Sequence, residues 1–214
     1  MSTIKSSAEN LTLNADGANN DIIFQSNGST KATLDQAGLL TATTFAGSGA
    51  SLTGFTDAQM PAGSLLQVKQ DVKTDKQVIA SYAYVDVLSL DITPSSTSSK
   101  ILVNFSLSVG VGGGGEGAHI KIMRGSTQIG FGDARGNRQR AFAVCGELPS
   151  DDAMALASGM YLDSPSSTSA ITYKIAVHGW SGSHPININC SGSDSNSANF
   201  STAVSTITLQ EIAG

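Results

Sequence analysis

Apolar and polar residues alternate along much of the chain after about residue 60. The clearest run is KILVNFSLSVGVGG, which begins at Lys100. Its apolar residues at every other position are Ile101, Val103, Phe105, Leu107, Val109 and Val111. A period of two over a dozen residues is typical of a β-strand with one buried face. The same alternation predicts strands in ITYKIAVHGW, PININC and STITLQEIAG.

The remaining pattern predicts more strands and no convincing helix. The segment HIKIMRGSTQIGFG predicts a hairpin with its turn at Gly125. The segment STITLQEIAG has apolar residues on both faces, so we expect this strand to lie centrally in a sheet. Further strands are expected over 65–70, 85–92, 138–144 and 154–162, separated by turn-rich segments. Eight or more short strands indicate an all-β fold, a β-sandwich of jelly-roll type.

The first sixty residues contain a short repeat. A large apolar residue is followed four positions later by glycine in LNADG, FQSNG, LDQAG and FAGSG, with steps of 11, 10 and 11 residues between the glycines. Each unit is too short to enclose a core, so its apolar face must stack along an axis or meet neighbouring chains. The alternative is an irregular tail with chance glycines. We therefore expect two parts: a repetitive β shaft or attachment segment over 1–60 and a jelly-roll head over 61–214.

The composition excludes several classes of protein. Only 14% of the 214 residues are charged and the net charge is -5, which argues against a coiled coil and against a basic nucleic-acid binder. No run of about 18 apolar residues occurs, so no membrane insertion is expected. The N-terminus MSTIKSSAENLTL lacks the apolar core of a secretory signal, so we expect synthesis in a cytoplasm.

Cys145 and Cys190 are the two cysteines of the chain. They are too few for a disulfide framework or a cysteine zinc site. Buried free thiols are the favoured interpretation. A single disulfide bond stays open as an alternative, if the two strands are neighbours.

No catalytic, metal or cofactor motif is present in the sequence. His119, His178 and His184 lack the H-x-H spacing of a metal pair, and we expect surface or core imidazoles. No G-x-S-x-G elbow occurs, and GVGGGGEG lacks the G-K-[ST] ending of a phosphate loop. We therefore predict no catalytic residue, no metal site and no cofactor, in a protein that is not an enzyme.

Arginine and tryptophan supply the candidate binding residues. All four arginines lie within seventeen residues, and Arg135, Arg138 and Arg140 share one segment. Guanidinium groups suit an anionic surface glycan. The alternatives are pairing between chains with acidic residues such as Asp133 or Glu147, or plain solvation. Trp180 stands alone in HGWSGSHP, where an indole either stacks on a sugar or anchors a core or interface.

Several segments together resemble a known family. They are GSGASLTGF, PSSTSSKILV, IKIMRGSTQIGFGDARG, YLDSPSSTSAITYKI and the terminal STITLQEI. In this order they are similar to phage tail-fibre and related virion-surface proteins, whose C-terminal heads resemble tumour-necrosis-factor and complement globular-head jelly rolls. The resemblance implies a parallel homotrimer, with an N-terminal segment that joins other virion proteins and a head that faces the host.

The function expected from the sequence is structural. The chain is interpreted as a non-enzymatic viral (phage) protein of the virion surface, a trimeric fibre or spike. It would attach to the host surface, with a surface glycan as a candidate partner, or decorate the particle. The alternative is a monomeric carbohydrate-binding module with a flexible N-terminal linker. A polysaccharide-degrading enzyme would need a pair of carboxylates in a groove between chains.

Overall fold

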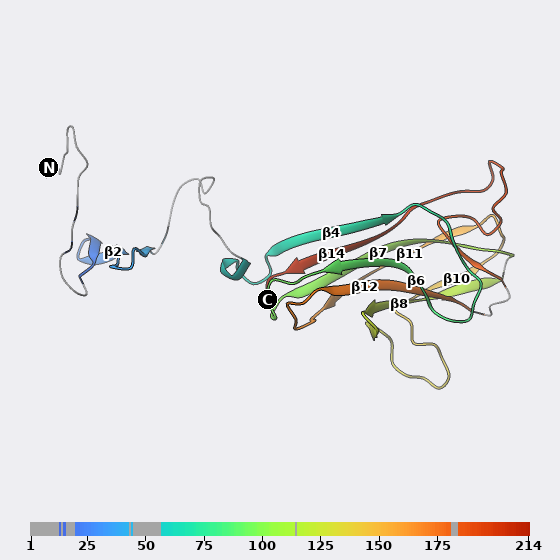
Figure 1. The fold of residues 1–214 in the computed structure, drawn as a ribbon, viewed down its shortest axis with the longest axis horizontal. Coiled ribbons are helices and arrows are strands. Elements are labelled where there is room, and N and C mark those ends of the chain that lie inside the picture. Colours follow the sequence, from blue (N-terminus) through green and yellow to red (C-terminus); the bar gives the residue numbers. More distant parts are fainter. Residues whose placement is uncertain are drawn as a thin grey trace. The chain divides into compact units, whose positions relative to one another are not determined.

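A computed structural model describes residues 13, 15, 20–42, 44, 57–113, 115–180 and 184–214. The chain divides into two compact units, Met1–Gly54 and Phe55–Gly214, and each is described by itself (Figure 1). Within the described residues, no helix has the length and apolar character needed to cross a membrane.

The first unit contains a small antiparallel sheet. Its strands are β1 (Ile22–Ser26), β2 (Ser29–Leu34) and β3 (Leu40–Ala42), in that order across the sheet. Asn27 and Gly28 form the first turn with φ angles of 51° and 74°, which is the left-handed conformation that a two-residue hairpin turn requires. Gly38 lies in the second turn with a φ of 82°. The predicted unit of a strand followed by a glycine turn is therefore confirmed for the repeats that end at Gly28 and Gly38, while Gly17 and Gly49 lie outside the described residues.

The second unit begins with a short 3-10 helix, η1 (Asp57–Gln59), and is otherwise built from strands. They are β4 (Leu65–Lys73), β5 (Gln77–Ile79), β6 (Val85–Ile92), β7 (Lys100–Val111), β8 (Glu116–Arg124), β9 (Thr127–Ile129), β10 (Ala143–Leu148), β11 (Met154–Asp163), β12 (Ile171–Gly179), β13 (Ile186–Ile188) and β14 (Ser205–Ile212). All their pairings are antiparallel.

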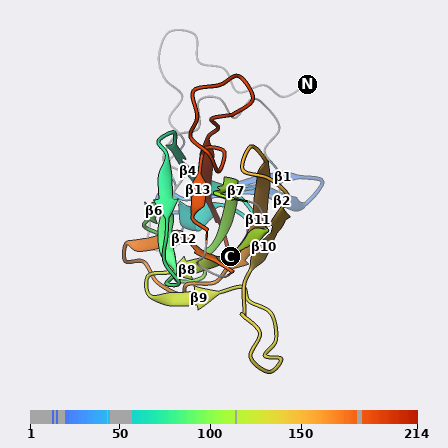
Figure 2. The same cartoon turned by 90° about the vertical axis from the view of Figure 1, so that its right-hand side faces the viewer.

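The strands form two sheets. In the first sheet, the long strand β7 pairs with β11 along one edge. Along its other edge β7 pairs first with β14 and then with β13. The sheet continues with β4, which pairs with β14, and with β5, which pairs with β13. The second sheet has the order β10-β8-β12-β6, and β9 pairs with the end of β8. The chain passes between the sheets several times, and the two layers are visible in Figures 1 and 2. The expected all-β sandwich of jelly-roll type is confirmed.

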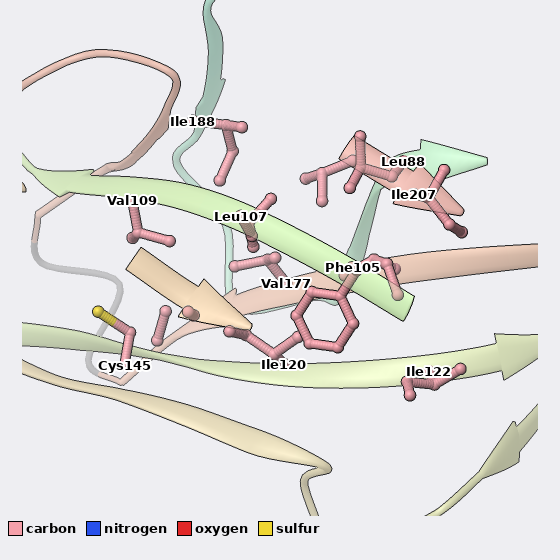
Figure 3. Packing of buried hydrophobic residues seen from close by; sticks show 14 of the residues in the cluster. Leu88, Phe105, Leu107, Val109, Ile120, Ile122, Cys145, Val177, Ile188 and Ile207 are labelled. Carbon is pink, nitrogen blue, oxygen red and sulfur yellow. The ribbon is translucent and has the colours of Figure 1, made fainter. Parts of the chain in front are cut away.

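The core lies between the two sheets. The six alternating apolar residues of β7 are all fully buried, and they meet residues of the second sheet such as Ile120, Ile122 and Val177 (Figure 3). In β14, Ile207 and Leu209 are also fully buried. As expected, β14 lies centrally, between β4 and β7, but its other face is not buried within the chain.

One expectation for a loop is corrected. The strand expected over 138–144 is instead a coil up to Phe142, and β10 begins only at Ala143. The coil is held by a turn, because the amide of Arg138 donates to the carbonyl of Arg135, and Nε of Arg140 donates 2.8 Å to the carbonyl of Gly132. These contacts replace the ladder hydrogen bonds of a strand.

The disulfide left open by the sequence does not form. Cys145 is a buried free thiol on β10, in the second sheet (Figure 3). Cys190 is a buried free thiol that follows β13, a strand of the first sheet.

Candidate interaction surfaces

The outward face of the first sheet carries one charged residue, Lys100 at its edge, over four neighbouring strands. The strand register places on this face Leu65, Val68, Gln70 and Val72 of β4, Thr206, Thr208, Gln210 and Ile212 of β14, Leu102, Asn104, Ser106 and Ser108 of β7, and Leu156, Ser158, Met160 and Leu162 of β11. We call these residues the uncharged face. Lys100, at the start of β7, marks its edge.

Half of the residues on the uncharged face are apolar, and those on its outer strands β4 and β11 are exposed. The exposed fraction is 67% for Leu156, 60% for Met160 and 53% for Val68. Two of its polar side chains bond to each other, because Nε2 of Gln70 donates 2.9 Å to Oγ1 of Thr208. Charged residues are depleted, and large apolar residues gathered, in surfaces that another protein covers. This face therefore has the composition of a protein–protein interface.

The outward face of the second sheet is different, because it carries charges and an aromatic cluster. Lys174 of β12 and Asp86 of β6 form an ion pair of 2.7 Å there. Beside it lies a group of rings that we call the histidine–aromatic cluster. Its members are His119 of β8, His178 of β12, Trp180, and Tyr82 and Tyr84 before β6.

Strand pairing brings the two histidines together. The alternation that buries Ile120 and Val177 turns His119 and His178 outward, and the β8–β12 register sets them directly opposite each other. Their ring centroids are 6.1 Å apart. Tyr84 stacks on His178 with a centroid distance of 5.0 Å. No sequence spacing signals this pair, because the two histidines are far apart along the chain.

The cluster is partly closed to solvent. His178 is only 6% exposed, whereas Trp180 is 39% and Tyr82 is 65% exposed. Burial is the largest cause that lowers the pKa of the His119 imidazole, and the nearby His178 and Lys121 lower this pKa further. The Nζ atom of Lys121 lies 3.7 Å from the centroid of the Tyr84 ring. Burial lowers the pKa of the Lys121 ammonium group and raises the pKa of the Tyr84 hydroxyl.

The structure does not bring the predicted binding residues into one site. The amide of Trp180 donates to the carbonyl of Gly117, near the start of β8. Arg135, Arg138 and Arg140 lie in the loop that leaves the β8–β9 hairpin at the opposite end of β8 and returns to β10. Trp180 and these arginines are therefore two separate candidates.

The arginine-bearing loop borders a depression in the sandwich unit. The guanidinium carbon of Arg140 lies 4.1 Å from the centroid of the Phe131 ring. A pocket of about 840 Å³ lies beside this ring, between the β8–β9 hairpin, the loop and β11, and is lined by Phe142 and Tyr161 among others. Arg124 lines the same pocket, but it forms an ion pair of 3.0 Å with Asp163.

No metal centre of three or more ligands is found in the part of the chain that the structure describes. Within those residues, no group of three or more His, Cys, Asp or Glu side chains is placed to hold an ion.

Comparison with known proteins gives only distant structural similarity. No protein-family model and no curated protein matches the chain. Two solved structures of infectious bursal disease virus, of the Gx and Gt strains, each match with a TM-score of 0.38, at 14% and 12% identity. They cover 69% and 86% of this chain, and 37% and 48% of their own.

A third similar structure is the VP2 subviral particle of the same virus. It matches with a TM-score of 0.30 and 11% identity, over 69% of this chain and 41% of its own. This chain thus spans less than half the length of each of these proteins. TM-scores below 0.5 do not assign the chain to their family.

Proposed function

We propose that the chain is a subunit of a non-enzymatic homotrimer on the surface of a phage virion. Residues 1–60 would form the shaft that joins other virion proteins, and the sandwich unit would be the head that contacts the host or decorates the particle. The similarity of five sequence segments to phage fibre proteins supports the viral assignment. The jelly-roll sandwich agrees with the head that this similarity implies.

The uncharged face is the observation that carries the proposal of an oligomer. A solvated outer sheet face normally alternates polar and charged residues with the buried ones. Here apolar side chains of all four strands face outward, and Lys100 at the edge is the one charged residue in register with them. Other copies of the chain are the favoured occupants, because every copy carries the same uncharged face and a cyclic trimer can cover all three faces around its axis.

The small N-terminal sheet supports the same conclusion independently. None of the described residues between 20 and 44 is buried, and Ile23 and Leu39 are 54% and 62% exposed. An isolated sheet of this size is marginally stable in water unless its apolar side is covered. Association with the same segment of other copies would supply that cover, as in a shaft built from three chains.

Attachment would rest on weak sites repeated on each head. Trp180 is a candidate for stacking on a sugar, and Arg135, Arg138 and Arg140 are candidates for an anionic group of a host-surface glycan. The three arginines are alternatively candidates for inter-chain pairing with Asp133 or Glu147. Three linked heads raise the overall affinity, because later contacts form within a tethered complex.

The mass of the full-length chain in solution tests this proposal. Light scattering would give about 66 kDa for a trimer, three times the 21.9 kDa of one chain. A mass near 22 kDa at all concentrations would contradict the trimer and favour the alternative, a monomeric carbohydrate-binding module with a flexible N-terminal linker. Binding of the same sample to a glycan array would support attachment to the host, and no binding would favour decoration of the particle.

A further inference from the structure

We propose that His119 and His178 together bind one divalent transition-metal ion, such as Zn²⁺, Ni²⁺ or Cu²⁺, on the outward face of the second sheet. The sequence predicts no metal site, because no two histidines have a metal-binding spacing. The pair is instead created by strand pairing, which sets the two residues directly opposite each other on β8 and β12. Both ligands belong to one chain, so the site does not depend on subunit association.

The first support is that both histidines carry an unsatisfied nitrogen. The Nδ1 atoms of His119 and His178 are shielded from solvent, and neither has a hydrogen-bond partner. Buried polar atoms in proteins nearly always have a partner, and an ion or water commonly fills this role. The two imidazoles are neighbours across adjacent strands, with 39° between their ring planes, and one ion between them would supply the missing partner.

The second support is the spacing of the rings. Zn–N bonds are about 2.0–2.1 Å long, so two imidazoles on one ion have ring centroids roughly 5 to 6 Å apart. The observed distance between the His119 and His178 centroids is 6.1 Å, slightly longer than this span. Either ring nitrogen can bind a metal, and the proposal requires the side chains to rotate so that one nitrogen of each ring reaches the ion.

The surroundings set the type of ion and the strength of binding. Imidazole ligands favour Zn²⁺, Cu²⁺ and Ni²⁺ over Mg²⁺ and Ca²⁺, which prefer oxygen. Two protein ligands leave the other coordination positions to water. The Tyr84 hydroxyl also lacks a partner, and its ring stacks on His178, so it is placed to bond such a water.

The expected affinity is moderate. The ammonium group of Lys121 lies over the Tyr84 ring and opposes a further positive charge beside it. With two imidazole ligands and this cation nearby, we expect dissociation constants in the micromolar range.

Metal titration of the full-length protein tests the site. Calorimetry with NiCl₂ and ZnCl₂ at pH 7.5, in a buffer that does not chelate, should give one ion per chain. His119→Asn and His178→Asn should each weaken binding at least tenfold. His184→Asn is the matched control, because it removes an exposed loop histidine and should leave binding unchanged.

A spectroscopic measurement on the wild type guards against a variant that fails to fold. The electron paramagnetic resonance spectrum of one equivalent of Cu²⁺ should show coupling to two imidazole nitrogens. The proposal is overturned if the wild-type protein binds none of these ions. It is equally overturned if binding survives the loss of either His119 or His178, or if only His184→Asn abolishes it.

Discussion

The hydroxyl of Tyr173 donates a hydrogen bond of 2.7 Å to Oδ2 of Asp163, although the two residues belong to different sheets. Nη1 of Arg124 donates to both oxygens of the same carboxylate, at 3.1 and 3.0 Å. Burial, together with the carboxylate of Asp163, raises the pKa of Tyr173. This buried network joins the end of β11 to the second sheet.

Replacing Tyr173 by phenylalanine should destabilise the fold. The change removes one hydrogen bond to a buried charged group and nothing else of the side chain, so the free energy of unfolding should fall by about 1.5 to 3 kcal/mol. Urea denaturation followed by circular dichroism measures this. Tyr82→Phe, at an exposed tyrosine, is the control and should change stability by less than about 0.5 kcal/mol. Equal effects of the two substitutions would contradict the role of the network.

The buried carboxylate of Glu211 should make stability depend on acid pH. Burial alone would raise its pKa, but hydrogen bonds from Gln67 and Ser95 hold the pKa below its usual value. A carboxyl group whose pKa is lower in the folded state stabilises the fold above its unfolded pKa of about 4.3. This contribution is lost as the pH falls through the lower, folded pKa.

Glu211→Gln tests this dependence. The variant should be less stable than the wild type at pH 7, and the difference should shrink between about pH 5 and pH 3. Urea midpoints across this range measure the effect, with Glu147→Gln on the surface as the control. A difference that stays constant with pH would show that the charge of Glu211 does not contribute.

Gly117 should be needed for the position of Trp180. A methyl group on Gly117 would lie 2.6 Å from the carbonyl oxygen of Cys145 and 2.6 Å from Cε2 of the indole. Gly117→Ala should therefore displace Trp180 and cost about 1 to 3 kcal/mol. Trp180 is the single tryptophan of the chain, so its fluorescence maximum reports the displacement directly. Gly132→Ala, which has open space around it, should leave the spectrum unchanged.

The two cysteines should react slowly in the folded protein. Both thiols are buried and unpaired, and burial raises the pKa of each. A thiol reagent should label neither residue in the native state within minutes, and both in urea, because the thiolate is the reactive form. Failure to label either cysteine in urea without reductant would reveal a disulfide and contradict the structure.

Most of the fold follows from residue alternation, because burial of one strand face leaves a period of two. The segments expected over 85–92 and 154–162 correspond to β6 and β11, and the last strand lies centrally as expected. The strand expected over 138–144 was wrong, because the residue pattern around Arg138, Arg140 and Phe142 does not distinguish a loop from a strand. The side chains of Arg138 and Arg140 bond to carbonyl groups of the loop itself, which local alternation does not reveal.

The candidate surfaces were much harder to predict. Alternation indicates that His119 and His178 point outward, but only the pairing of β8 with β12 places them opposite each other. The uncharged face likewise joins residues of four strands that come from distant parts of the sequence. Which strands are neighbours is decided by tertiary packing, and a single sequence carries no local signal of it.

The most direct test of the account is whether the uncharged face holds the subunits together. Light scattering should compare the wild type with Met160→Glu, on the edge strand β11 of that face, and with Val144→Glu, at a similarly exposed position on β10 of the other sheet. A buried, unpaired carboxylate costs about 3 kcal/mol or more, which weakens association more than about 100-fold. The account predicts about 66 kDa for the wild type and for Val144→Glu, and a mass near 22 kDa for a folded Met160→Glu. A folded Met160→Glu that keeps the wild-type mass would contradict it.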